Sequence, residues 1–167
     1  TDAWADPPGL TEHLHTEKLL RLDKGFLCFT PPAESPEVPP LPFIERGYVT
    51  FGSFNALPKI TAEMLAVWSR ILLGKPGSRL LIKNAQLTDP VLQERLRNQL
   101  AQLGVADERV EIVGQTSKAE HMEILGKVDI ALDTYPYHGT TTTCDTLWMG
   151  VPVITLAGKS HVSRVGV

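Results

Sequence analysis

The residues best suited to chemistry lie between positions 133 and 152, in the segment DTYPYHGTTTTCDTLWMGVP. Gly139 allows a ligand to approach the backbone closely, and it precedes a predicted helix over residues 143–149. Threonine hydroxyls and the free N–H groups of a helix N-terminus together favour a phosphate or diphosphate. The alternative is that one threonine caps the helix and the others only fill the loop. The four candidates are Thr140, Thr141, Thr142 and Thr143.

Three further residues could bind the nucleoside part of such a ligand. Asp145 lies in the predicted helix, where its carboxylate could accept hydrogen bonds from both hydroxyls of a ribose or merely complement the helix dipole. Lys118 and His121 lie one helical turn apart and face the same way, so both could contact a nucleoside. A lysine near a helix N-terminus is electrostatically unfavourable unless an anion or a cluster of hydroxyls is close.

Lys59 is the candidate for stabilising negative charge. It lies in FNALPKI, residues 54–60, where the chain leaves the first predicted strand. If the ligand is a sugar nucleotide, the charge on its leaving group would be neutralised by Lys59, the threonine hydroxyls and helix N–H groups. The alternative is that Lys59 is an ordinary solvent-exposed lysine.

Several other kinds of site are excluded by their missing motifs. Gly158, Lys159 and Ser160 resemble the end of a phosphate-binding P-loop, but Val153 stands where that motif needs its first glycine. No GxGxxG follows a strand, which excludes the dinucleotide fingerprint. The histidines and cysteines lack metal-ligand spacing and no DxD pair exists, so we expect no metal ion and no cofactor.

Composition gives the broad class of protein. Of the 167 residues, 43% are hydrophobic and 21% are charged, as in globular domains. The net charge of −3 argues against nucleic acid or an anionic membrane as a partner. No apolar run is long enough to span a membrane, and Cys28 and Cys144 cannot build a disulfide framework. We therefore expect a protein of the reducing cytoplasm.

Strand and helix patterns alternate from Tyr48 onward. Buried-strand patterns alternate with amphipathic helices that begin at the capping residues Thr61, Asp89 and Ser117. This alternation predicts an α/β fold, with a mostly parallel, Rossmann-like sheet covered by helices on both faces. Ligands of such sheets bind beyond the carboxyl ends of the strands. The strands are predicted near residues 48–54, 79–83, 110–114, 128–132 and 152–156.

The N-terminal segment, residues 1–47, has a different composition. Eight of the 13 prolines fall within residues 1–42, which predicts an extended connector without a core of its own. Residues 11–22 have modest helix character, and residues 25–29 could form a short strand. We expect residues 1–47 to be a linker or the tail of a preceding lobe, and residues 48–167 to be a sugar-nucleotide-binding lobe truncated at its C-terminus.

Taken together and in this order, these segments resemble the C-terminal catalytic lobe of the O-linked N-acetylglucosamine transferases, glycosyltransferase family 41, and in particular their bacterial members. The likeness covers residues 46–167. It implies a GT-B enzyme with two Rossmann-like lobes, metal-independent and inverting, that moves N-acetylglucosamine from UDP-N-acetylglucosamine to Ser or Thr hydroxyls of proteins. The matching pieces are FGSFNALPKIT, GKPGSRLLIKN, RVEIVGQTSKAEHM, VDIALDTYPYHGTTTTCDTLWMGVPVITLAG and SRVG.

The resemblance also implies a role for each candidate residue. Lys59 would contact the donor diphosphate, Lys118 and His121 the ribose and uracil, and Asp145 the ribose. Thr141 and Thr142 would bind phosphate, beside Thr140. The opposing lobe with the catalytic base, and tetratricopeptide repeats that select acceptor proteins, would lie upstream. The isolated fragment should therefore be inactive.

Three positions depart from the animal members of the family. Ala56 replaces a glutamine, Thr140 a histidine and Ile124 an arginine near the base. Related plant-type members transfer fucose from a GDP donor, so GDP-fucose stays an alternative donor. A second alternative is a non-catalytic sensor or scaffold that binds a sugar nucleotide without turnover.

Overall fold

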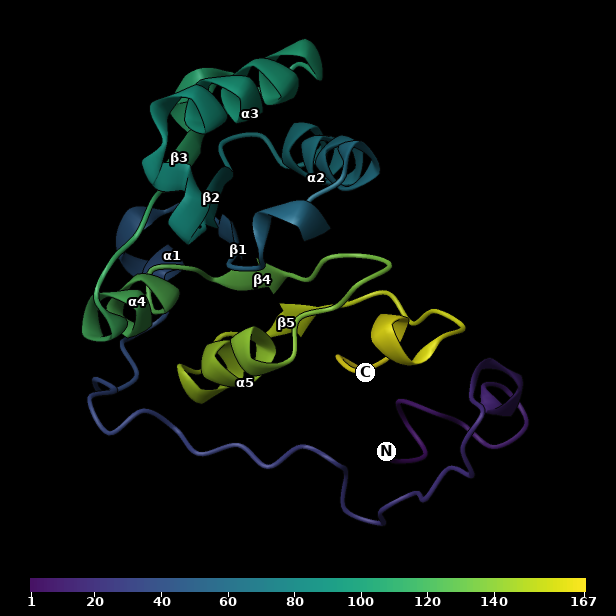
Figure 1. The fold of residues 1–167 in the computed structure, drawn as a ribbon. Coiled ribbons are helices and arrows are strands. Elements are labelled where there is room, and N and C mark those ends of the chain that lie inside the picture. Colours follow the sequence, from purple (N-terminus) through teal and green to yellow (C-terminus); the bar gives the residue numbers. More distant parts are fainter.

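A computed structural model describes residues 1–167 and contains one five-stranded sheet in the order β3-β2-β1-β4-β5. All four strand pairs are parallel, and the central strand β1 pairs with β2 on one side and β4 on the other (Figure 1). The predicted parallel sheet is therefore confirmed. Its strands are β1 (Thr50–Ser53), β2 (Arg79–Lys83), β3 (Val110–Val113), β4 (Ile130–Leu132) and β5 (Val153–Ile154).

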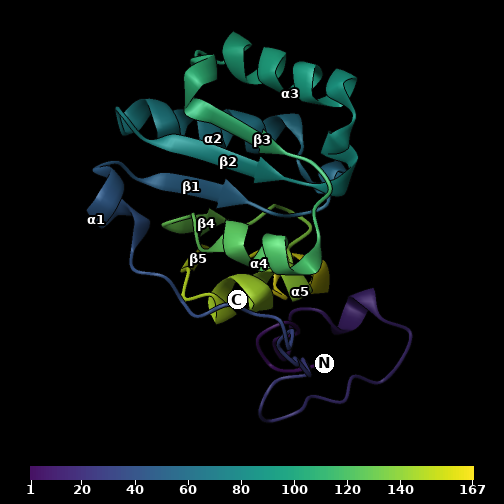
Figure 2. The same ribbon diagram turned by 90° about the vertical axis from the view of Figure 1, so that its left-hand side faces the viewer.

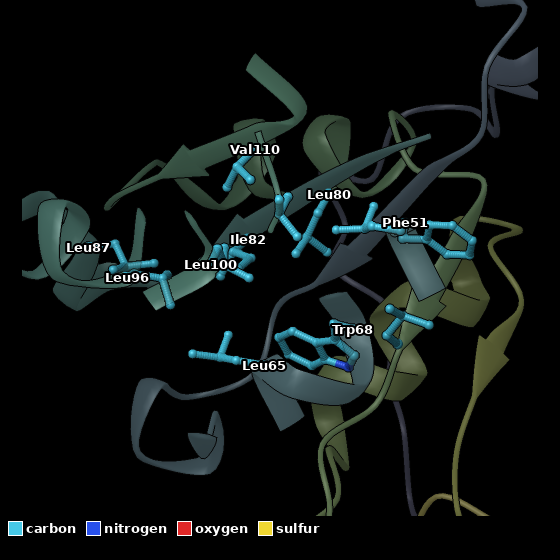
Figure 3. Packing of buried hydrophobic residues seen from close by; sticks show 12 residues of the cluster. Phe51, Leu65, Trp68, Leu80, Ile82, Leu87, Leu96, Leu100 and Val110 are labelled. Atoms are coloured by element: carbon cyan, nitrogen blue, oxygen red, sulfur yellow. The ribbon is translucent and has the colours of Figure 1, made fainter. Parts of the chain in front are cut away.

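Two helices cover each face of the sheet (Figure 2). Helices α2 (Ala62–Gly74) and α3 (Pro90–Gln102) pack on one face, where Trp68 and Leu100 lie in the larger apolar cluster, as predicted (Figure 3). Helices α4 (Lys118–Leu125) and α5 (Thr141–Trp148) cover the other face, where Met122 and Met149 pack against Phe54 and Leu81. Burial of these apolar side chains is the main force that holds the layers together. No helix combines the length and the apolar character that a bilayer span requires.

The helices begin where the capping residues predict, with one exception. Thr61 accepts a hydrogen bond from the N–H of Met64, and Ser117 forms a reciprocal capping box with Glu120. Helix α5 begins at Thr141 rather than at residue 143. Its N-cap residue, Thr140, has φ −122° and ψ −79° and makes no side-chain capping bond. The alternative in which one threonine caps this helix is therefore wrong, because this backbone conformation is not the extended one from which an N-cap side chain reaches the first turn.

The N-terminal segment contributes no residue to either apolar cluster. The possible strand over residues 25–29 is wrong, and the helix character of residues 11–22 is realised only as the 3₁₀ turn η1 (Glu12–Leu14). Residues 25–29 are not part of the five-stranded sheet. The proposed boundary at residue 47 stays a prediction. The remaining 3₁₀ turns are η2 (Leu57–Lys59), η3 (Ala85–Thr88), η4 (Asp107–Arg109) and η5 (His161–Ser163).

Long-range polar contacts nevertheless hold the N-terminal segment on the sheet layer. Helix α1 (Pro42–Arg46), which the sequence did not predict, is anchored by Asp129, whose carboxylate accepts the N–H groups of Phe43 (2.7 Å) and Thr50 (2.8 Å). Nearer the N-terminus, the buried carboxylate of Asp6 lies 2.6 Å from Nδ1 of His161. The segment is thus attached at both of its ends.

Candidate functional site

Asp133 organises the carboxyl edge of the sheet at the end of β4. Its side chain is 1% exposed. Oδ1 accepts hydrogen bonds from the N–H of Gly139 (2.8 Å), the N–H of Thr134 (2.8 Å) and Nδ2 of Asn55 (3.2 Å). Oδ2 accepts the hydroxyl of Thr155 at 2.9 Å. One carboxylate therefore joins the loops that follow β1, β4 and β5.

Gly139 lies in a crowded part of the loop after β4. A Cβ atom added there would be 2.6 Å from Oδ1 of Asn55 and 2.9 Å from Oγ1 of Thr143. No side chain fits in that space, so the glycine has a steric reason beyond flexibility. It brings the chain into the first turn of α5 directly beside Asp133.

His138 fastens the same loop to the residues after β5. The ring is fully buried, and the N–H of Gly166 donates to Nδ1 at 3.3 Å. Because Nδ1 is thereby an acceptor, Nε2 carries the proton and donates to the carbonyl of Leu156 at 3.0 Å. This histidine is a structural element of the loop and does not face a ligand.

Lys59 reaches this loop from the turn after β1. Its Nζ donates to the carbonyl of His138 at 2.8 Å and lies 3.8 Å from the ring centroid of Tyr137. Burial lowers the pKa of Lys59, and the carboxylate of Asp133 opposes that shift. An ammonium group has three donors, and the chain engages one of them. Lys59 is thus a positioned, partly desolvated cation with donors to spare for an anion.

A cavity of about 300 Å³ lies at the N-terminal end of α5. It brings together four of the predicted residues, Lys118, Thr140, Thr141 and Asp145. Thr142 lies outside this cavity, in the narrow space beside Asn55 and Asp133, and Lys59 is not part of its lining. The remaining lining residues are Leu27, Cys28, Phe29, Thr30, Pro32 and Cys144.

Asp145 carries an unpaired carboxylate in this cavity. It makes no hydrogen bond with the chain through its side chain, and burial raises its pKa while Lys118 opposes the shift. The pKa of the neighbouring Cys144 is raised by burial and by the charge of Asp145. A half-buried carboxylate with both oxygens available can accept two hydrogen bonds from a vicinal diol.

His121 lies apart from that cavity, although it follows Lys118 by one turn of α4. Its ring meets Phe54 edge to face, with the centroids 5.9 Å apart. Burial and then the nearby Lys83 lower the pKa of His121 to about 4, so the imidazole is neutral at pH 7. His121 does not line the cavity that contains Thr141 and Asp145, because its ring packs against Phe54 instead. Its predicted contact with the nucleoside stays a prediction.

The sequence profile of Glycosyl transferase family 41 matches residues 44–167. The chain belongs to this family. A mutant O-GlcNAc transferase of Thermobaculum terrenum has a solved structure that matches with a TM-score of 0.90 and 40% sequence identity, over 98% of this chain and 31% of that one. This likeness confirms that the α/β layers correspond to a lobe of a GT-B fold.

Two plant proteins resemble this family 41 chain, one of them along its whole length. A probable UDP-N-acetylglucosamine–peptide N-acetylglucosaminyltransferase SPINDLY of Petunia hybrida is 46% identical over 168 residues, 100% of this chain and 18% of the plant protein. A protein of Arabidopsis thaliana with the same description, named SEC, is 35% identical over 69% of this chain and 12% of its own length. The chain thus spans less than one fifth of these relatives. The narrower expectation of a bacterial member stays a prediction.

Two parts of the family 41 site were missed by sequence reasoning. The sequence patterns single out neither Asp133 nor Asn55 as a candidate, although a carboxylate directly after a buried strand is itself a signal of a polar hub. Five residues between positions 27 and 32 line the cavity, in a segment that the sequence presented as a linker. No local sequence pattern indicates that residues 27–32 lie beside the first turn of α5.

Proposed function

We propose that this chain is the donor-binding lobe of an inverting, metal-independent glycosyltransferase. The reaction would move N-acetylglucosamine from UDP-N-acetylglucosamine to Ser or Thr hydroxyls of proteins. The observation that carries the proposal is the meeting, at one sheet edge, of the cation of Lys59, the uncapped first turn of α5 and the cavity of Asp145 and Lys118. Lys59 suits the charge of the diphosphate, and the N–H groups of α5 suit the phosphate oxygens. The cavity of Asp145 and Lys118 suits the ribose.

The chemistry follows from where charge develops. As the sugar leaves, negative charge grows on the β-phosphate, and a preorganised cation and N–H donors stabilise it. The hydrogen bond to the carbonyl of His138 holds Lys59 in position, so little reorganisation is needed. Thr141 and Thr142 begin α5, whose dipole also favours an anion.

We propose that the other lobe, the catalytic base and repeats that select the acceptor lie outside these 167 residues. The likeness to relatives of which this chain is less than one fifth supports that division. Cys28 and Cys144 are both free thiols, which is consistent with work in the cytoplasm.

The test is calorimetry on the full-length protein that contains this chain, followed by mass spectrometry of an acceptor peptide. UDP-N-acetylglucosamine should bind and add a single N-acetylhexosamine to a Ser or Thr. Absence of binding to any sugar nucleotide would refute the proposal. Binding without transfer would instead support the sensor or scaffold.

The choice of donor is tested in the same experiment. Ala56, Thr140 and Ile124 differ from the residues of animal members, so GDP-fucose is titrated beside the UDP-sugar. Tighter binding of GDP-fucose, with transfer of a deoxyhexose to the peptide, would replace N-acetylglucosamine by fucose and leave the role of the lobe unchanged.

A further inference from the structure

Tyr137 places an aromatic ring against the ammonium group of Lys59. Nζ of Lys59 lies 3.8 Å from the centroid of that ring, within the range of a cation–π interaction. Tyr137 is 53% exposed and belongs to neither apolar cluster. Burial in a core therefore does not explain where this ring lies, and its contact with the cation is the interaction to account for.

The backbone around Tyr137 is held by hydrogen bonds on both sides, so the ring starts from a fixed position. The hydroxyl of Thr134 donates to the carbonyl of Tyr137 at 2.7 Å. The N–H of the next residue, His138, donates to the carbonyl of Val162 at 2.9 Å. The loop thus presents two consecutive residues to Lys59, the ring of Tyr137 and the carbonyl of His138, which lies 2.8 Å from Nζ.

Both contacts favour the charged form of Lys59. A carbonyl oxygen and the negative face of an aromatic ring each attract an ammonium more strongly than a neutral amine. Burial lowers the pKa of Lys59, and the carboxylate of Asp133 is the charged group that opposes this shift. Lys59 forms no salt bridge, and the ring nitrogens of His138 are engaged with Gly166 and Leu156. The tyrosine ring and the carbonyl are therefore the groups that hold the ammonium directly.

We propose that Tyr137 is a positioning residue for Lys59, whose ring orients the ammonium and keeps it protonated. The inference rests on the proposed function, since it assumes that Lys59 stabilises the leaving diphosphate. An ammonium has three N–H donors in fixed directions. The carbonyl of His138 accepts one of them and the ring covers a second side of the group, so a donor on the remaining side stays available for an anion.

The first experiment compares Tyr137→Leu with Tyr137→Phe in steady-state transfer by the full-length protein. Leucine keeps apolar cover over Lys59 but removes the π-face, whereas phenylalanine keeps the ring and loses only the hydroxyl. Tyr137→Leu should lower kcat about three- to tenfold, change the donor KM less, and move the alkaline limb of the pH–rate profile to lower pH. Tyr137→Phe should keep both properties close to wild type. Equal losses in the two variants, or an unmoved alkaline limb in Tyr137→Leu, would overturn the inference.

Tyr48→Leu is the matched control. Tyr48 also packs its ring against a cation, Arg79, whose Cζ lies 4.4 Å from the ring centroid. It precedes β1 and therefore lies at the amino edge of the sheet, away from Lys59. Tyr48→Leu should leave kcat and the alkaline limb unchanged, and all three variants should melt at the temperature of the wild type.

The second experiment measures the protonation of Lys59 without any donor. The full-length protein is acetylated with acetic anhydride at a series of pH values, and Lys59 is quantified by peptide mass spectrometry. The midpoint of this titration reports the protonation of the amine, whereas accessibility changes only the maximal rate. The midpoint should be lower in Tyr137→Leu than in the wild type and unchanged in Tyr137→Phe.

This titration separates the failure of the inference from the failure of the proposed function. An unchanged midpoint in Tyr137→Leu would overturn the action of Tyr137 on Lys59, even in a protein that transfers a sugar. A wild-type protein that transfers no sugar would instead refute the proposed function, and with it the catalytic purpose of this contact.

Discussion

Replacing Lys59 by alanine tests the chemistry of the site most directly. The ammonium is positioned between the carbonyl of His138 (2.8 Å) and the ring of Tyr137 (3.8 Å), and burial lowers its pKa. Truncation removes a cation that is already desolvated and oriented. We expect Lys59→Ala in the full-length enzyme to lower kcat by about 10²–10³, as for the loss of one preorganised donor.

The size of this loss in kcat follows from Coulomb's law. A unit charge about 4 Å from an ammonium gains roughly 4 kcal/mol at an effective dielectric constant of about 20. The bound diphosphate already carries charge in the ground state, so only the part that develops during transfer affects kcat. Hence the expected loss is about 3–4 kcal/mol at most. The donor KM should change less than kcat.

The assay is steady-state transfer to an acceptor peptide, with circular dichroism to verify folding. Lys75→Ala is the matched control, because Lys75 is exposed at the opposite, amino edge of the sheet. Lys59→Arg should rescue only part of the activity, since a planar guanidinium does not replace a compact ammonium between two fixed groups. A kcat of Lys59→Ala within about threefold of wild type would contradict this role of Lys59, because losing a preorganised donor costs far more than that.

Four further outcomes are expected in the full-length protein. Asp145→Ala should weaken UDP binding by about 1.5–3 kcal/mol in calorimetry, because it removes a charged acceptor for the ribose; unchanged affinity would leave Asp145 a helix-dipole residue. Gly139→Ala should lower the free energy of unfolding, measured by urea denaturation, by about 1–3 kcal/mol, because the new Cβ would meet Asn55 and Thr143. Gly74→Ala is the control and should not lower it, because the space around Gly74 is open. The rate of transfer should decline as pH rises through the pKa of Lys59, which burial lowers from 10.5. Asp133→Asn removes the charge that opposes this shift, so the alkaline limb of the pH–rate profile should move to lower pH. An unmoved limb would contradict the electrostatic coupling between Asp133 and Lys59. The pKa of His121 is about 4 in the folded state and about 6.5 when unfolded, so the contribution of the neutral ring to stability is lost as pH falls from 6.5 toward 4. His121→Gln should reduce this acid-induced loss in the free energy of unfolding by about 2 kcal/mol, allowing for partial solvent access.

The elements and their order could be predicted from the sequence. Local patterns place the strands, and the caps at Thr61, Asp89 and Ser117 begin three helices because each side chain bonds an N–H group two or three residues away. The alternation of strand and helix then requires parallel strands, so the loops after β1 and β4 meet at one edge. That reasoning was enough to bring Lys118, Thr141 and Asp145 to one cavity.

The contacts between distant groups are set by the packing of the whole molecule. Asp129 anchors Phe43 from 86 residues away, Asn55 meets Asp133 across 78 residues, and Phe29 lines a cavity with Asp145. His121 turns toward Phe54 because burial of its ring is settled by the packing of α4 on the sheet. Periodicity and capping express forces that act within a few residues. Contacts across the molecule depend on how the layers pack, and no local pattern contains that information.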